Sequence, residues 1–155
     1  NAGAANSGNV EVGVDTQWYC GSSNACKGNT RTTSLATGTV DFFMDCAGES
    51  SCKDAEIGLT NTKQPENAYV CCRKKDSCAG NVRFRTMGDL SVSCVDDDTA
   101  CKAAVFEAGG DLRIKCSGGD SCVDTDVSFG GSCCCDGPGC EDLVVSNGQT
   151  CNSAC

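Results

Sequence analysis

The stretch LRIKCSGGDSC, from Leu112 to Cys122, joins an alternating apolar segment, a glycine turn and two cysteines that are separated by five residues. Nearly the same phrase recurs along the chain. The cysteine pairs of the phrase are Cys20/Cys26, Cys46/Cys52, Cys72/Cys78, Cys94/Cys101 (one residue longer), Cys116/Cys122 and Cys134/Cys140, followed by a shorter pair, Cys151/Cys155. The first cysteines of the first five pairs follow one another at intervals of 26, 26, 22 and 22 residues. This recurrence predicts a repeat architecture.

The residues before the first cysteine of each phrase alternate between apolar and polar. Apolar side chains stand four and two residues before that cysteine: Trp18, Phe42, Met44, Ala68, Val70, Leu90, Val92, Leu112 and Ile114. This alternation predicts a strand with one buried face. A second short strand is expected after each phrase, in AEIGL (55–59), NVRFR (81–85), AAVFE (103–107), TDVSF (125–129) and DLVVS (142–146). The apolar residues Val82 and Phe84 lie one position out of phase, which predicts either a bulge there or a misalignment of the repeats.

A unit of this size with two short strands cannot bury its own apolar face, but stacked units can. The sequence therefore predicts an all-β fold, a small disulfide-rich parallel β-helix (β-solenoid) of about six rungs. The repeats occupy residues 16–155, and residues 1–15 form an N-terminal arm. The alternative fold is a string of small EGF-like disulfide modules, in which cysteine spacing usually varies.

Disulfides are expected to hold this fold together. Seventeen of the 155 residues are cysteine, and only 5% are aromatic. Such a composition is typical of secreted proteins, so the expected location is extracellular or at the cell surface. The sequence does not open with a signal peptide, which predicts that one has been removed or that a longer precursor exists. The net charge of −9 disfavours binding to nucleic acid or anionic membranes, and no apolar run has the length of a membrane span.

The constant spacing predicts disulfides within each phrase. The expected pairs are Cys20–Cys26, Cys46–Cys52, Cys72–Cys78, Cys94–Cys101, Cys116–Cys122, Cys134–Cys140 and Cys151–Cys155. Cys135 is the alternative first cysteine of the sixth phrase, and bonds between stacked rungs are the alternative to the whole set. Cys71, Cys133 and Cys135 remain, and an odd cysteine in a secreted chain predicts a bond to another chain or a free thiol. We expect the interchain bond.

The sequence offers little for catalysis. It has no histidine and no C-x2-C pair, so we expect no metal site, no cofactor and no enzyme activity. The acidic residues Asp96–Asp98, Asp120, Asp124 and Asp126 are interpreted as solvated turns, with calcium binding as the alternative. A polysaccharide-active enzyme would need the basic residues to face acids in one groove: Arg83, Arg85, Lys102, Arg113 and Lys115. O-linked glycans on Ser and Thr, foremost in the Thr-rich loop after Cys26, are further expected partners.

From about Trp18 to Cys155, the C-x5-C phrases and their flanking strands resemble the cysteine-rich β-helical repeats of extracellular proteins in algae and other protists. Some of those proteins are similar to components of flagellar hairs (mastigonemes) or other surface filaments. We therefore expect a structural subunit of an extracellular filament or surface appendage. The alternatives are a secreted adhesin or glycan-binding module, for which Trp18 and Tyr19 are candidate contacts, and the polysaccharide-active β-helix enzyme.

Both termini suggest how such a subunit assembles. Val10, Val12 and Val14 alternate with polar residues, the pattern of a strand that could extend the sheet of a neighbouring copy. No capping helix is recognisable in GQTCNSAC (148–155), which ends within a cysteine phrase. Together these features predict a head-to-tail homopolymer, the alternative being that the valine strand caps its own first rung.

Overall fold

The computed structural model describes residues 16–28, 30–31, 41–57 and 64–153. Their regular structure consists mainly of two sheets of six parallel strands each. Sheet A contains the odd-numbered strands: β1 (Thr16–Tyr19), β3 (Asp41–Cys46), β5 (Asn67–Cys72), β7 (Leu90–Cys94), β9 (Leu112–Cys116) and β11 (Cys133–Asp136). Sheet B contains the even-numbered strands: β2 (Thr30–Arg31), β4 (Glu56–Ile57), β6 (Arg83–Thr86), β8 (Val105–Ala108), β10 (Asp126–Phe129) and β12 (Val144–Val145). Two short 3-10 helices, η1 (Pro138–Asp142) and η2 (Ser146–Gly148), flank β12.

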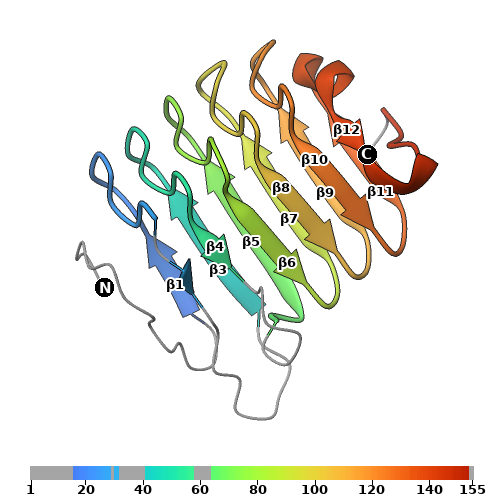
Figure 1. Cartoon of the computed structure of the whole chain (residues 1–155), viewed down its shortest axis with the longest axis horizontal. Coiled ribbons are helices and arrows are strands. Elements are labelled where there is room, and N and C mark those ends of the chain that lie inside the picture. Colours follow the sequence, from blue (N-terminus) through green and yellow to red (C-terminus); the bar gives the residue numbers. More distant parts are fainter. Residues whose placement is uncertain (1–15, 29, 32–40, 58–63, 154–155) are drawn as a thin grey trace.

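Consecutive strands alternate between the two sheets, so each pair of strands adds one rung. Figure 1 shows the rungs side by side, from β1 at the blue end to β11 and β12 at the red end. The predicted disulfide-rich β-solenoid is confirmed, and the string of EGF-like modules is wrong. The predicted N-terminal strand with Val10, Val12 and Val14 lies outside the described residues.

The core consists of ladders of like residues from successive rungs. In sheet A one ladder contains Phe42, Ala68, Leu90 and Leu112, and the next contains Met44, Val70, Val92 and Ile114, all buried. In sheet B the ladder is Ile57, Phe84, Phe106 and Val127, also buried. The rings of Phe84 and Phe106 stack at 5.9 Å between centroids, as parallel in-register strands allow. The predicted inward positions of sheet A are thus confirmed.

The expected bulge near Val82 is absent from the described strands. Phe84 pairs directly with Ile57 and with Phe106, and Val82 is buried. The extra residue of this repeat lies in the turn between Cys78 and Val82. A turn at the end of a rung accepts an insertion without breaking the ladder, whereas an insertion inside a strand would reverse its inward face.

The C-terminal end of the solenoid is partly covered. Asn152 lies parallel to β11, donates its N–H to the oxygen of Cys133 and accepts from the N–H of Cys135, both at 2.9 Å. A disulfide between Cys133 and Cys151 fixes this segment. This segment contains no helix in its described residues, and Asn152 covers part of the last rung through two backbone hydrogen bonds.

Polar side chains form a ladder at the start of the sheet A strands. The amide of Asn67 donates to Asp41, and the oxygen of Asn67 accepts the N–H of Asp89, both at 3.0 Å. Asp89 accepts the N–H of Asp111 at 2.9 Å, and Asp111 accepts the N–H of Ser132 at 2.8 Å. Each turn is therefore connected to the next rung by a hydrogen bond to a side chain, in addition to the backbone hydrogen bonds of the sheet.

The second residue after each phrase's second cysteine adopts a left-handed conformation. The residues at this position are Gly28, Asp54, Gly80, Ala103 and Asp124, with φ between 56° and 85°. Glycine and aspartate tolerate this region, whereas a Cβ without a compensating polar group is strained there. Ala103 is the member of this set that carries the strain without compensation.

Ala103→Gly should therefore stabilise the protein, by about 0.5–1 kcal/mol after the greater freedom of glycine in the unfolded chain is subtracted. The matched control is Gly28→Ala at the equivalent position, where a Cβ would meet no described atom within 4 Å and only the backbone conformation is disfavoured. This control should destabilise by a similar amount. Guanidinium unfolding with disulfides intact measures both, and a less stable Ala103→Gly variant would contradict the assignment.

A second prediction concerns the polar ladder. Hydrogen bonds from the backbone and side chain of Ser132 lower the pKa of the Asp111 carboxyl. The ionised Asp111 carboxyl therefore stabilises the fold at pH values above the ordinary carboxyl pKa. This stabilisation is lost as the pH falls through the lowered pKa of Asp111. Asp111→Ala should lower the melting temperature near neutral pH. Asp111→Asn, which keeps an acceptor as Asn67 does, should lose less and should flatten the acid limb of the stability profile. Equal losses in both variants would argue against the ladder.

Candidate functional site

A hollow on the outer face of sheet A is the candidate site. It has a volume of about 360 Å³, within the range of about 300–1,000 Å³ usual for ligand pockets. We call this hollow the sheet A groove. Its lining includes Phe43, Tyr69, Ser91, Ser93, Arg113 and Lys115. A more polar hollow shares Tyr69, Ser91 and Arg113 and extends toward the polar ladder.

Strand alternation and register produce this groove. In one outward row Tyr69 of β5, Ser91 of β7 and Arg113 of β9 are neighbours. In the next row Cys71, Ser93 and Lys115 are neighbours. Because β7 contributes only small serines outward, it forms a low floor between the larger side chains of β5 and β9.

Exposed aromatic rings gather on this face. Four of the seven Phe and Tyr residues, Phe42, Phe84, Phe106 and Phe129, are buried in the core. The other three point outward from sheet A: Tyr19, Phe43 and Tyr69, which are 63%, 40% and 49% exposed. Phe43 and Tyr69 are direct register partners and form one continuous apolar wall. Burying such rings against a ligand would be favourable, so this face is the candidate binding surface.

The opposite wall of the groove is basic. Arg113 and Lys115 form no salt bridge within the described part of the chain, whereas Arg73 pairs with Asp45 at 3.0 Å. On sheet B, Arg85 pairs with Glu107. Asp136, the register partner of Lys115, lies at the end of the groove.

Cys71 is the free cysteine of the described residues, and it lines the groove. Burial raises the pKa of its thiol, and the charge of Arg73 acts in the opposite direction. The thiol is therefore largely protonated near neutral pH, so its nucleophilicity is low. Cys133 and Cys135, the other two candidates for an interchain bond, are disulfide-bonded within the chain.

Five disulfides have the predicted partners: Cys20–Cys26, Cys46–Cys52, Cys72–Cys78, Cys94–Cys101 and Cys116–Cys122. Their Cα atoms are 5.8–6.0 Å apart. The predicted pairs Cys134–Cys140 and Cys151–Cys155 are wrong: Cys140 pairs with Cys135, and Cys151 pairs with Cys133.

Strand alternation in β11 explains this correction. Cys133 and Cys135 point into the core in register with Leu112 and Ile114, whereas Cys134 is in register with the outward residue Arg113. Only an inward cysteine can continue the stack of disulfides between the sheets. Cys134 is also disulfide-bonded.

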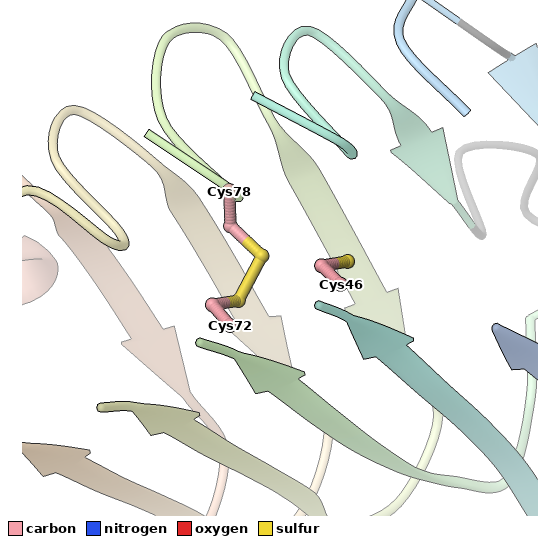
Figure 2. A group of neighbouring side chains, drawn as sticks. All are labelled: Cys46, Cys72 and Cys78. Atoms are coloured by element: carbon pink, nitrogen blue, oxygen red, sulfur yellow. A yellow bond between two sulfur atoms is a disulfide. The ribbon is translucent and has the colours of Figure 1, made fainter. Parts of the chain in front are cut away.

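Cysteine sulfurs from neighbouring rungs lie close together without forming a metal site. Figure 2 shows Cys46 beside the Cys72–Cys78 disulfide of the next rung, and these three residues have sulfurs within 4.8 Å of one another. A second such group contains Cys116, Cys135 and Cys140. All six sulfurs are in disulfides, whereas metal ligation requires thiolates.

The structure does not bring the charged residues of the enzyme hypothesis into one groove. Arg83 and Arg85 are on β6 of sheet B, whereas Arg113 and Lys115 are on the outer face of sheet A. Asp96–Asp98 lie in a cysteine loop, where Asp97 accepts hydrogen bonds from the N–H and hydroxyl of Thr99. Asp120, Asp124 and Asp126 belong to the next loop and the start of β10.

Of the two aromatic residues proposed as contacts, only Tyr19 is on the outer face. Trp18 packs against Phe42, with ring centroids 5.7 Å apart. Sequence reasoning missed Phe43 and Tyr69, although both occupy outward positions of strands whose inward positions were assigned correctly. Aromatic residues at outward positions were the available signal.

No family model, curated protein or solved structure matches this chain. None of the described helices has the length and apolar character needed to cross a membrane. The density of disulfides fits a protein folded in an oxidising, secretory environment.

Cys71 provides a test of the site's electrostatics. Because its pKa is raised, alkylation by iodoacetamide should be slow near neutral pH and should accelerate as the pH rises. Arg73→Gln removes the charge that lowers this pKa, so it should slow alkylation further. Arg83→Gln, on sheet B, is the control and should leave the rate unchanged. Mass spectrometry without reduction measures the label, and faster reaction of Arg73→Gln would contradict the description.

Proposed function

We propose that the protein is a structural subunit of an extracellular filament or surface coat, built by end-to-end addition of β-solenoids. The observation that carries this proposal is the sheet edge at β1. Within the described residues, β1 has a strand partner on one side only, β3. An unpaired strand edge is a template for another chain.

Hydrogen bonding identifies the groups at this edge. The N–H of Cys20 donates to the oxygen of Asp45 at 2.8 Å, so it faces the interior of the sheet. Alternate residues of a strand direct their backbone groups to opposite sides, and Gln17 and Tyr19 therefore present theirs at the edge. At the other end of the solenoid, Asn152 covers part of β11, which leaves β12 as the second edge for a heterologous contact. A heterologous contact that does not close into a ring gives an open filament.

A covalent bond between copies would further stabilise such an assembly. The odd number of cysteines supports this idea. Cys71, the free cysteine of the described residues, lies in the sheet A groove and not at the β1 edge, so a bond through it would link copies side by side and not end to end. Any O-linked glycans on the Thr-rich segment would add to a surface role, but that segment lies outside the described residues.

Gln17→Pro tests the edge directly. Proline removes the N–H of Gln17, which makes no bond to β3, and its φ is compatible with an edge strand. We expect a folded protein with the disulfides unchanged and assembly reduced by at least about tenfold in the concentration required. The matched control, Gln17→Ala, keeps the N–H and should assemble as the unaltered chain does.

Analytical ultracentrifugation and negative-stain electron microscopy of the full chain, secreted from a eukaryotic host, measure the assembly. Filaments of unchanged length from Gln17→Pro would exclude β1 as the connector. A monomer at all concentrations for the unaltered chain would overturn the structural proposal itself.

A further inference from the structure

The two outer faces of the solenoid differ in chemistry although both sheets are parallel and contain six strands. The described outward positions of sheet B carry charged, aliphatic and hydroxyl groups and no aromatic ring: Glu56, Arg83, Arg85, Val105, Glu107, Asp126, Ser128 and Val144. Sheet A carries all three exposed rings and the groove. Solvent exposure alone does not produce this difference, so the sheet A groove requires a separate explanation.

We propose that the sheet A groove binds an acidic oligosaccharide, with sugar rings against Phe43 and Tyr69 and carboxylate or sulfate groups at Arg113 and Lys115. This inference does not depend on filament assembly, because the groove lies in the middle of a sheet face and not at the edge of β1.

The aromatic wall fits the apolar side of a sugar ring. Phe43 and Tyr69 are each about half exposed and adjacent in register, so together they offer a strip of ring surface across two strands. The C–H groups of a pyranose can lie on such a strip while its hydroxyls remain in contact with water. Tyrosine also presents a polar hydroxyl at the rim.

The floor and the opposite wall fit the polar groups of the same ligand. Ser91 and Ser93 are partly exposed and offer hydroxyls that can donate to or accept from sugar hydroxyls. Arg113 is two strands away from Tyr69, a spacing of about 10 Å. A sugar stacked on Tyr69 can therefore place the acidic group of the next residue at Arg113.

Charge complementarity favours an anionic ligand over a neutral one. Arg113 and Lys115 are exposed at successive outward positions of β9, both line the groove, and neither is in a salt bridge with a described residue. Asp136 at the end of the groove would limit how far the anion extends past Lys115. The planar guanidinium of Arg113, which faces the aromatic wall, is suited to carboxylates and to sulfates.

Binding can be measured by calorimetry with the full chain and defined oligosaccharides. The probes are oligouronates from alginate, sulfated oligosaccharides from carrageenan and neutral oligosaccharides from cellulose. An oligoglutamate peptide tests whether an acidic polypeptide is the preferred ligand. We expect an acidic oligosaccharide to bind, with affinity that falls as salt is added, and the neutral oligosaccharide and the peptide to bind at least about tenfold more weakly.

Matched variants assign the site. Tyr69→Ala and Arg113→Gln should each weaken binding by about tenfold or more. Met87→Ala removes another exposed apolar side chain, and Arg83→Gln removes an exposed arginine from sheet B, so neither should change the affinity. All four positions are on the surface, and non-reduced peptide mapping with thermal unfolding checks that each variant is folded.

The Cys71 thiol gives a second readout within the groove. Bound oligosaccharide should slow its alkylation in the unaltered chain, and should not do so in Tyr69→Ala.

Equal weakening by Arg113→Gln and Arg83→Gln would overturn the proposal in favour of nonspecific ionic binding. Stronger binding of oligoglutamate would overturn it in favour of a protein partner. If no acidic oligosaccharide binds, the proposal is also overturned. If the protein then self-associates through this face, the occupant of the groove is a second copy of the chain.

Discussion

The disulfide that closes each cysteine loop is the interaction on which the rest of the structure depends. Each rung contributes only a few apolar side chains to the space between the sheets, and a chain with so few aromatic residues cannot form an ordinary core. Closing a loop of about seven residues removes roughly 2 kcal/mol of unfolded-state entropy. The same cysteines also fill the third inward position of sheet A, since Cys46, Cys72, Cys94 and Cys116 are buried and in register. The crosslink and part of the core are thus one group of atoms.

The disulfide also determines where variation is tolerated. It fixes the end of one strand and the start of the path to the next, so the residues between two cysteines can change in number without moving the ladders. Cys94–Cys101 contains one residue more than its neighbours and has the same Cα separation within 0.2 Å. The extra residue after Cys78 lies outside that loop, in the turn before β6 begins. Length differences between repeats fall in loops and turns because an insertion inside a strand would reverse every side chain that follows.

Most of the fold could be predicted from the sequence because its strongest signals are local. Alternation identified the inward residues from Phe42 to Ile114, and constant spacing identified five disulfides. The errors occurred where one local rule competed with another. In Cys133–Cys134–Cys135, spacing favoured Cys134 as the partner of Cys140, but the inward direction of Cys135 decided the pairing. The cap formed by Asn152 depends on a contact between distant parts of the chain, which spacing does not encode.

The candidate site was harder to predict because it uses positions that the fold leaves free. Ladders, turns and disulfides constrain the inward side chains, whereas an outward residue of a parallel strand has no packing partner to satisfy. Phe43 and Tyr69 remain 40% and 49% exposed, so the core does not require aromatic rings at these positions, and the described outer face of sheet B has none. Register then adds what the sequence cannot show, since it places Tyr69, Ser91 and Arg113 in one row although they are 22 residues apart in succession. In a solenoid, a binding surface is therefore best sought as an outward row read along the axis, across the repeats rather than within any one of them.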